Sequence, residues 1–532
     1  MKKFLKSKIN SFNTDQIKLF KDLQKNDKLQ LCIPTGGGKN YIMMIDILNQ
    51  LVSTDKKVFT ISSHRLMLNN QHMNDMFNMF SLMIGKIGFV FVGSSKYDVS
   101  KFMNNTVFNK ALLKKRLRYE EIISSTTNTK EVDSLIEGHL DAGRKVIVMT
   151  TYHSLHTLKN QYIDTLYCDE AHTLASDEDG ARFKENFNMI VADRKFFLTA
   201  TPKDCVEDTE SFLMNNKEVF GERVGLTFNE CVTKGYMVTP VMHIALPDNF
   251  DPTLDFKSVK NMSKFVSDTF WAHKNWLSEV SSDPSKIAPK ILVKCPSVDD
   301  MWKIKEELTG KMEGVSICAG ASRNENSNFN HFIDEEGIVN RSEYLERLQS
   351  FSDDKMLIVL HFDTMSEGIN LSGFSGVMFL GGKLPTIIKT LQNTGRATRL
   401  HPIDRERFRN GEIVVGDGNW IKPYCAVIIP YWDSESEFTK VELARQIKGL
   451  RDNFGYDPVY YVSIGSDIGL GDKKEELDEL NKKDEKEKRS ELIENIRHEI
   501  EVMDKEELDL AEQERINNMS VEEWFNYAND IN

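Results

Sequence analysis

Short apolar runs alternate with amphipathic, helix-like stretches along most of the chain, and this alternation limits the folds open to it. Five runs lie in the first part of the chain and five in the second, at residues 29–33, 57–62, 146–150, 165–168 and 196–199, then 290–293, 315–318, 356–360, 376–379 and 425–429. Strands separated by helices form parallel sheets with helices on both faces. The sequence therefore predicts an α/β fold with two parallel-sheet lobes.

The two sets of runs are separated by an extended stretch at 235–240, which predicts where the lobes join. We expect lobe one over residues 1–234, lobe two over 235–471 and an acidic helical tail over 472–532. A partly helical insertion that bears Lys and Arg is expected at about 83–144, inside lobe one. Apolar residues recur at helical spacing in the tail. A solvated helix is the favoured interpretation of the tail, and a partner-binding helix or coiled coil is the alternative.

The net charge of −13 lies mainly in the tail, which has 10 basic and 21 acidic residues. The tail thus carries −11 and leaves about −2 on the two lobes, so a basic cleft for nucleic acid is not excluded. The seven cysteines include no CxxC pair, and no apolar run is long enough to cross a membrane. The basic N-terminus lacks the apolar segment of a signal peptide. We expect a cytoplasmic protein of a bacterial or virus-infected cell, with no membrane partner.

A glycine loop follows the first apolar run and leads into a helical pattern: Thr35, Gly36, Gly37, Gly38 and Lys39. The main-chain N–H groups of such a loop converge on phosphate oxygens, and Lys39 would reach the β- and γ-phosphates. The next residue is Asn40, where a hydroxyl that binds Mg²⁺ is usual. The amide oxygen of Asn40 is a hard, neutral donor that can also hold Mg²⁺. We expect a retained magnesium site, and a nucleotide-binding switch with poor turnover is the alternative.

Two adjacent acids, Asp169 and Glu170, end the apolar run at 165–168. Asp169 can hold Mg²⁺, directly or through water, and Glu170 can orient and deprotonate an attacking water. Adjacent acids on their own are usually solvated surface residues. Acids at a strand end downstream of a phosphate loop seldom are, so the sequence predicts ATP and Mg²⁺ as cofactors and ATP hydrolysis as the reaction.

A third pattern lies in the second lobe, where Gln392, Arg396 and Arg399 fit the spacing Gln-x-x-Gly-Arg-x-x-Arg. The two arginines are three residues apart and share one face of a helix. Offered from the opposite lobe, they can neutralise charge on the γ-phosphoryl group as it is transferred. Because these arginines would act only when the lobes close, closure and hydrolysis would become one event.

Together with the glycine loop, Asp169-Glu170-Ala171-His172 resembles a superfamily two helicase of the DEAH type. The best likeness is to the restriction-subunit-like and phage recombination helicases, and the ordered motifs cover about residues 10–430. The resemblance implies two RecA-like lobes in tandem. It also implies an ATP-dependent helicase or translocase that moves on or remodels nucleic acid, with DNA favoured over RNA.

The resemblance assigns roles to further residues. The expected adenine-reading residues are Phe12 and Gln16, and Asn13 stands where many relatives have an arginine. The expected nucleotide contacts of lobe two are Glu367 and Gly368. The expected nucleic-acid contacts are Ser62, His64, Arg65, Thr150, Thr151, Thr364 and Asn370. The residues expected to couple hydrolysis to movement are His172, Thr199 and Thr201.

Several alternatives remain open at the level of the sequence. The chain could be an ATP-gated clamp or scaffold whose acidic tail recruits a protein partner, an RNA helicase, or the motor subunit of a restriction enzyme. His64 and Arg65 could be ordinary helix-start residues. The stretch 270–276, with two tryptophans and a lysine, could stack bases, but its spacing fits a buried helix face better. The basic helix of the insertion could contact duplex or branched DNA.

Overall fold

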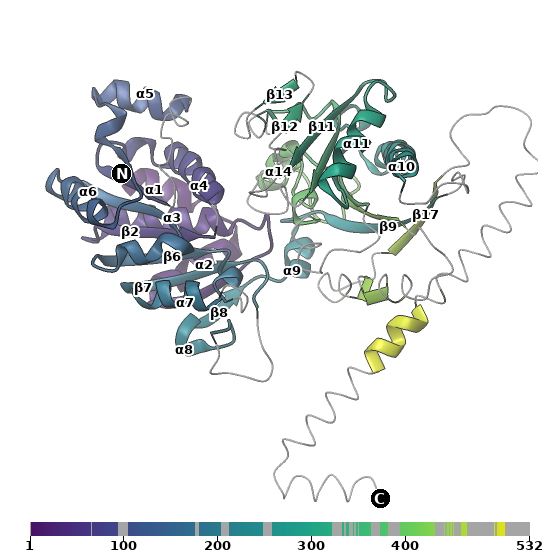
Figure 1. The fold of residues 1–532 in the computed structure, drawn as a ribbon. Coiled ribbons are helices and arrows are strands. Elements are labelled where there is room, and N and C mark those ends of the chain that lie inside the picture. The colour runs from purple at the N-terminus through teal and green to yellow at the C-terminus, as the bar shows by residue number, and fades with distance from the viewer. Residues whose placement is uncertain are drawn as a thin grey trace, which may run out of the picture. The chain divides into compact units, whose positions relative to one another are not determined.

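The chain forms two compact units, each built around its own sheet (Figure 1); one ends at Met237 and the other begins at Val238. The structure is a computed structural model, and it describes residues 2–64, 66–93, 105–175, 180–203, 212–247, 258–321, 332–334, 337–339, 344, 347–348, 350–362, 373–380, 394–430, 441, 444–445, 447–448, 451, 459–464, 494 and 497–505. In each unit, long buried strands lie at the centre of the sheet, as continuous apolar runs predict.

The sheet of lobe one has eight strands in its described part, all parallel, in the order β4-β3-β5-β2-β6-β7-β1-β8. The strands are β1 (Lys28–Cys32), β2 (Val58–Ser63), β3 (Ile87–Val92), β4 (Ile123–Thr126), β5 (Lys145–Thr151), β6 (Tyr162–Asp169), β7 (Val191–Thr199) and β8 (Glu222–Gly225). The five strands that the sequence predicted are β1, β2, β5, β6 and β7, which occupy the middle of the sheet.

Helices cover both faces of this sheet (Figure 1). They are α1 (Lys2–Ile9), α2 (Thr14–Lys25), α3 (Lys39–Ser53), α4 (Leu66–Met79), α5 (Thr106–Lys115), α6 (Thr129–Asp141), α7 (Gly180–Asn188), α8 (Lys217–Phe220) and α9 (Phe228–Thr233). Residues of α1 to α5 share one apolar cluster with one face of the sheet, whereas residues of α6, α7 and α8 share a second cluster with the other face. Two 3₁₀ turns, η4 (Tyr152–Leu158) and η5 (Ala171–Thr173), follow β5 and β6 directly.

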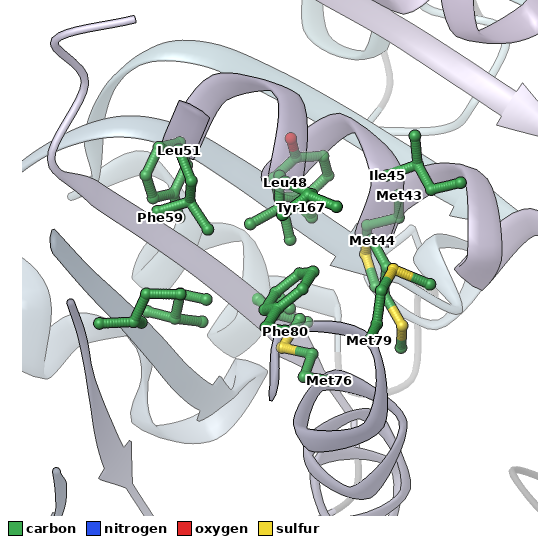
Figure 2. Close-up of a cluster of buried hydrophobic side chains, with 14 of the residues drawn as sticks. Met43, Met44, Ile45, Leu48, Leu51, Phe59, Met76, Met79, Phe80 and Tyr167 are labelled. Atoms are coloured by element: carbon green, nitrogen blue, oxygen red, sulfur yellow. The ribbon is translucent and has the colours of Figure 1, made fainter. Parts of the chain in front are cut away.

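The first of these clusters fixes α3 and α4 against the sheet (Figure 2). Met43, Met44 and Leu48 of α3 meet Met76 and Met79 of α4 over the strands, and all five side chains are buried. Unbranched methionine side chains fill irregular gaps between helices. The two helices that begin at the carboxyl edge of the sheet thus pack against each other and against its strands.

The region 83–144, expected as a partly helical insertion, lies in lobe one and extends its sheet. It supplies β3, which pairs with β5, and β4, which pairs with β3. Helices α5 and α6 complete the extension. The run Ile87–Val92 is apolar throughout, as is usual for a strand buried on both faces of a parallel sheet.

The sheet of lobe two has nine strands in its described part, in the order β13-β12-β11-β14-β10-β15-β16-β9-β17. They are β9 (Thr239–Pro247), β10 (Lys290–Lys294), β11 (Val315–Ala321), β12 (Phe332–Asp334), β13 (Gly337–Val339), β14 (Met356–Phe362), β15 (Gly376–Phe379), β16 (Tyr424–Pro430) and β17 (Val459–Ile464). In this spatial order, the seven strands β11-β14-β10-β15-β16-β9-β17 are parallel. Strands β12 and β13 pair antiparallel at the β11 edge. The expected tandem pair of RecA-like parallel-sheet lobes is thus confirmed.

The helices of lobe two settle one of the open alternatives. They are α10 (Val259–Val280), α11 (Val298–Leu308) and α14 (Pro402–Arg409). The aromatic-basic stretch lies in α10, where Phe270 and His273 are buried and Trp276 packs against His243. The buried-face interpretation is therefore the correct one for the core of this stretch. In the tail, residues 497–505 are helical and Ile500 is buried.

No helix in the described part of the chain is both long and apolar enough to span a membrane.

Candidate active site

The register of lobe one brings the predicted motifs to one edge of the sheet. Cys32, just before the glycine loop, pairs with Thr199, and Asp169 pairs with Leu198. Ser62 pairs with both Thr150 and Cys168. Because the strands are parallel, these neighbouring positions all lie at the carboxyl ends, where α/β sheets bind ligands.

The glycine loop needs its glycines for geometric reasons. Gly36 and Gly38 both have φ of 96°, a left-handed conformation that side chains disfavour. A Cβ atom on Gly38 would lie 2.6 Å from Nε2 of Gln16, and one on Gly37 would lie 2.5 Å from Cγ2 of Ile33. Gly38 is the residue before α3, so the loop presents the start of that helix. This conformation suits phosphate binding.

The expected adenine-reading segment packs against the loop. The Nε2 atom of Gln16 lies 3.4 Å from the carbonyl oxygen of Gly37, and the Phe12 ring meets the Tyr41 ring edge-on at 5.5 Å. Asn13, which replaces the arginine of many relatives, caps α2 and forms a capping box with Gln16. Asn13 is therefore used to set the start of the helix.

The last residues of lobe one also reach this segment. Asp15 accepts hydrogen bonds from Lys234 Nζ at 2.9 Å and from the Tyr236 hydroxyl at 2.8 Å. Cys231 of α9 is buried, and a Cβ atom on Gly37 would lie 3.7 Å from its Sγ. The segment at which lobe one ends is thus fastened to the nucleotide-facing side of the lobe.

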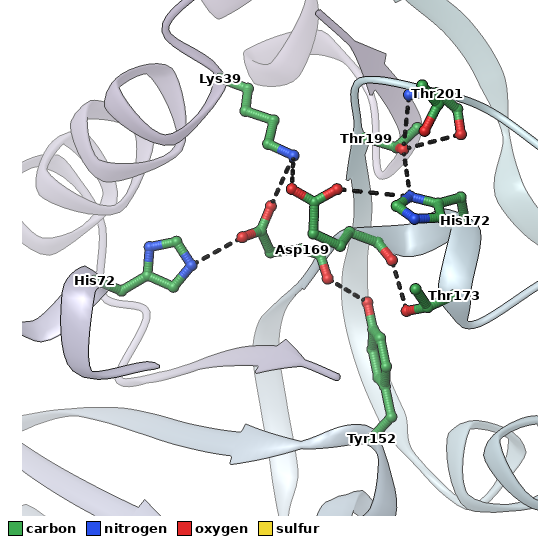
Figure 3. A network of polar contacts seen from close by, with 9 residues as sticks. Lys39, His72, Tyr152, Asp169, His172, Thr173, Thr199 and Thr201 are labelled. Carbon is green, nitrogen blue, oxygen red and sulfur yellow. Dashed lines mark hydrogen bonds and ion pairs between the residues drawn. The ribbon is translucent and has the colours of Figure 1, made fainter. Parts of the chain in front are cut away.

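Lys39 joins the two acids at the centre of the site (Figure 3). Its Nζ atom lies 2.6 Å from Oε1 of Glu170 and 3.3 Å from Oδ1 of Asp169. Burial alone would lower the pKa of Lys39, but the two carboxylates outweigh burial and raise it above its usual value. Burial would likewise raise the pKa of Asp169, whereas Lys39 and the hydrogen bond from His72 hold it well below its usual range. Lys39 and Asp169 are both charged at neutral pH.

Asp169 has two further partners, which the sequence did not predict. Nε2 of His72 in α4 lies 2.9 Å from Oδ2 of Asp169, and the Tyr152 hydroxyl donates to the main-chain carbonyl of Asp169 at 2.7 Å (Figure 3). Both rings are fully buried. Tyr152 is the third residue of the motif Thr150-Thr151-Tyr152, which is the local signal that could have pointed to it. His72 had no such signal.

Glu170 begins a tight turn that leads to the expected coupling residues. Its φ is 53°, one of two left-handed non-glycine conformations in the described part of the chain. The Thr173 hydroxyl donates to the Glu170 carbonyl at 2.8 Å and stabilises the turn. His172 Nδ1 lies 2.9 Å from the Thr199 hydroxyl, which accepts the Thr201 N–H at 3.1 Å. The structure thus places His172, Thr199 and Thr201 in one chain of contacts beside Glu170 (Figure 3).

The residues expected to hold Mg²⁺ have suitable oxygen atoms. Oδ1 of Asn40 is buried and has no hydrogen-bond partner within the described residues. Oδ1 of Asp169 is likewise buried, and the ammonium group of Lys39 lies 3.3 Å from it. Burying an acceptor without a partner is costly, whereas a hard cation takes such amide and carboxylate oxygens as ligands. The two side chains therefore fit a magnesium ion.

The expected nucleic-acid contacts are only partly visible. Ser62, Thr150 and Thr151 lie at the correct edge but are buried, and His64 is half-buried. Contact with a strand at these positions would therefore use the main chain or follow a local rearrangement. The other candidates in this set, and three further predicted site residues, lie outside the described residues: Arg65, Thr364, Glu367, Gly368, Asn370 and Gln392.

A buried lysine, Lys422, binds the main chain beside the two predicted arginines of lobe two. Arg396 is buried and Arg399 half-buried, at the end of the helical turn 394–397. Nζ of Lys422 lies 2.5 Å from the carbonyl oxygen of Ala397, 2.7 Å from that of Arg399 and 2.6 Å from that of Phe374. Burial lowers the pKa of Lys422 to about 8. This lysine satisfies carbonyls at a helix end that would otherwise be orphaned.

The basic helix of the insertion lies away from this site. Its cations Lys110, Lys114, Lys115 and Arg116 are exposed. Lys115 Nζ donates to the carbonyls of Leu82 and Ile84, which precede β3 and so lie at the amino edge of the sheet. The phosphate loop and the acids occupy the opposite edge. Contacts between this helix and DNA would be separate from the motifs, and they remain a prediction.

Comparisons with known proteins agree with this geometry. Residues 3–204 match the family model of the type III restriction enzyme, res subunit. No curated protein matches the chain. The structure of the ATP-dependent type ISP restriction-modification enzyme LlaBIII bound to DNA is similar at 15% identity and a TM-score of 0.58, over 92% of this chain and 33% of that one. The helicase Lhr of Mycobacterium smegmatis, bound to ssDNA and AMP-PNP, is similar at 13% identity and a TM-score of 0.50, over 85% of this chain and 49% of that one.

The fold and the site first define an architecture: two RecA-like parallel-sheet lobes in tandem, the first of which carries a glycine loop and a lysine paired with two adjacent acids. The family match over the first lobe then confirms the resemblance to the restriction-subunit-like group. The chain spans about a third of the length of LlaBIII and about half that of Lhr. At these identities the two solved structures show a shared fold.

Proposed function

We propose that the protein is an ATP-dependent DNA translocase or helicase, in which Mg²⁺-dependent ATP hydrolysis between the lobes drives movement on or remodelling of DNA. The observation that carries the proposal is the contact of Lys39 with Asp169 and Glu170, buried at the carboxyl edge of the sheet. The match to a restriction-enzyme family supports DNA as the polymer.

The pairing of Lys39 with Glu170 suggests how hydrolysis would depend on bound nucleotide. Lys39 donates a hydrogen bond to Oε1 of Glu170, so this oxygen is engaged by the lysine and not by a water molecule. The phosphates of ATP would compete for the Lys39 ammonium group and release the Glu170 carboxylate, which could then orient and deprotonate water. Asn40 and Asp169 would hold Mg²⁺, which would neutralise phosphate charge when bound.

The second lobe would complete the reaction. Arg396 and Arg399 would neutralise charge on the γ-phosphoryl group in the transition state, with Gln392, Glu367 and Gly368 as further expected contacts. Hydrolysis would then require lobe closure. The contact of His172 with Thr199 supports these residues as the link from Glu170 to the next motif. For the acidic tail, a solvated helix remains the favoured prediction and protein binding the alternative.

A panel of ATPase and strand-separation assays tests the proposal. The full chain would be assayed with single-stranded, duplex, forked and four-way DNA and with RNA, in the presence of ATP and Mg²⁺. We expect DNA to stimulate hydrolysis. We expect Glu170→Gln to lower kcat by at least 100-fold while ATP still binds, because the base is lost. Glu185→Gln is the matched control, since Glu185 is exposed on α7.

The other outcomes would distinguish the remaining functions. ATP binding without turnover in saturating ATP and DNA would contradict the translocase proposal and favour an ATP-gated clamp. The clamp is the second candidate because Asn40 stands where a hydroxyl that binds Mg²⁺ is usual. Stimulation by RNA alone would make the protein an RNA helicase. Cleavage of DNA only with an added nuclease subunit would identify a restriction motor.

A further inference from the structure

The acid at the centre of the site is held by both segments that carry expected strand contacts. Helix α4 begins at Leu66, just after His64, and its His72 contacts the Asp169 side chain. The turn η4 begins at Tyr152, just after Thr151. The Tyr152 hydroxyl donates to the main-chain carbonyl of Asp169. With Lys39 of the phosphate loop, Asp169 thus has partners from three elements.

We propose that His72 and Tyr152 are positioning residues that transmit nucleic-acid binding to the acid pair, so that a strand at the carboxyl edge changes the site that hydrolyses ATP. The inference rests on the proposed function. It assigns the link between the strand contacts and the ATPase to two residues that were not among the predicted site residues.

The first link acts through a rigid helix. The core packing of α4 involves Met73, Met76 and Phe77, all of which are buried, so the helix moves as one body. His72 is two turns from the start of that helix. A shift imposed at His64 would therefore move Nε2 of His72 relative to Oδ2 of Asp169. In this contact the ring donates from Nε2 to the carboxylate.

The second link acts through a peptide plane. Tyr152 holds the carbonyl of Asp169, and the peptide that carries this carbonyl leads into Glu170 with its φ of 53°. A left-handed conformation is unfavourable for a non-glycine residue and persists only where neighbours impose it. The η4 turn is itself anchored, since Asn186 Nδ2 donates to the carbonyls of Tyr152 and His153. Movement of the strand end at Thr150 and Thr151 would thus reorient Glu170.

A binding experiment measures this link without relying on turnover. The Kd of a fluorescein-labelled single-stranded oligodeoxynucleotide would be measured by anisotropy on the full chain, with and without AMP-PNP and Mg²⁺. The ratio of the two Kd values is the coupling between the sites, and linkage makes it the same in both directions. A typical coupling is about 5- to 150-fold. The DNA stimulation of kcat would be measured in parallel.

The variants remove one contact at a time. We expect Tyr152→Phe and His72→Leu to bring the coupling ratio at least threefold closer to one and to lower DNA stimulation by a similar factor. His72→Gln, which keeps a donor, should restore most of the coupling. Tyr167→Phe is the matched control, because its hydroxyl is equally buried two residues from Asp169 but donates to Asp46. It should keep the wild-type ratio even if its melting temperature falls.

Two results would overturn the inference alone. One is a wild-type Kd ratio in Tyr152→Phe and His72→Leu. The other is an equal loss of coupling in Tyr167→Phe, which would show a general effect of destabilisation. A wild-type protein that neither binds DNA nor responds to nucleotide would refute the proposed function and the inference together. A wild-type protein with DNA-stimulated hydrolysis but uncoupled binding would refute the inference and leave the proposed function standing.

Discussion

Among single residues, Asn40 departs most from what a phosphate loop usually contains, and its proposed role is to bind Mg²⁺ through its amide oxygen. Its side-chain oxygen is buried without a hydrogen-bond partner in the described part of the chain, close in sequence to the lysine that contacts both acids. An amide oxygen offers the same hard donor chemistry as a hydroxyl. The substitution thus changes the length of the ligand and keeps its type.

Replacing Asn40 gives a direct measure of this role. We expect Asn40→Ala to raise the Mg²⁺ concentration for half-maximal ATPase by about tenfold, because an oxygen donor is lost, in line with the effect of disturbing a metal's surroundings. Asn40→Thr should retain Mg²⁺ use. Asn49→Ala, on the same helix and away from the loop, is the control. Equal Mg²⁺ titrations for Asn40→Ala and the wild type would show that Asn40 is not a ligand.

At the level of elements, the end of the turn that carries Arg396 depends on Lys422. Three carbonyls converge on one ammonium group, and Asp404 accepts the main-chain N–H groups of Ile421 and Lys422. A buried cation surrounded by main-chain acceptors fixes local geometry more firmly than a water-filled helix end. The arginines would thereby be presented in a set orientation.

We expect Lys422→Met to lower kcat at least tenfold with little change in ATP affinity, since the arginines would lose their support. The free energy of unfolding should fall by about 3 kcal/mol because buried carbonyls would be left unpaired. Lys311→Met, at an exposed lysine of the same lobe, is the control. Steady-state kinetics well below the melting temperature would check this, and an unchanged kcat would refute the positioning role.

A second feature at the level of elements is a pair of buried histidines, His243 in β9 and His273 in α10. Burial lowers the pKa of His243 to about 4, and burial with the nearby charges of His243 and Lys422 lowers that of His273 to about 3. His273 Nε2 contacts the Ser375 hydroxyl at 2.8 Å. The lowered pKa values favour neutral rings in the folded lobe. In the unfolded chain both rings would take up protons near pH 6.5.

Lobe two should therefore lose stability in acid. Between about pH 6.5 and pH 4 the unfolded state binds more protons than the folded state, so unfolding becomes easier as the pH falls. His243 alone could contribute up to about 3 kcal/mol over this range. Urea unfolding at pH 7, 5.5 and 4.5 would measure it. His243→Leu should flatten the dependence, whereas replacing the exposed His153 should not; identical slopes for the wild type and His243→Leu would contradict the assignment.

At the scale of the whole molecule, the residues proposed for ATP hydrolysis come from two compact units. The acids and the phosphate loop belong to the first unit, and the arginines belong to the second. We expect Arg396→Ala to lower kcat by about 1000-fold or more, as loss of an arginine finger does, while ATP and DNA still bind. Arg409→Ala, at an exposed position of α14, is the control. Single-turnover hydrolysis at a normal rate in Arg396→Ala would refute a shared site.

The parts of the fold predicted from sequence were those with local signals. The continuous apolar runs identified ten central strands, and the glycine and acid patterns lie together at the carboxyl edge of the sheet in lobe one. Some strands that escaped have weaker patterns, since β8 reads Glu-Arg-Val-Gly and β9 contains prolines near both ends. Strand β3 escaped although its run is apolar throughout, because the region 83–144 was taken for an insertion. His72, Tyr152 and Lys422 escaped because their partners lie far away along the chain. Only tertiary packing brings such residues together.

The fastening of Asp15 to Lys234 and Tyr236 bears on where lobe one can be cut. The sequence suggested a boundary after residue 234, but a fragment ending there would strip Asp15 of its tyrosine partner. The same cut would free the end of α9, whose Cys231 lies against the glycine loop. A fragment of lobe one should therefore extend through Met237. Without these residues, the nucleotide affinity measured for the fragment would differ from that of lobe one in the full chain.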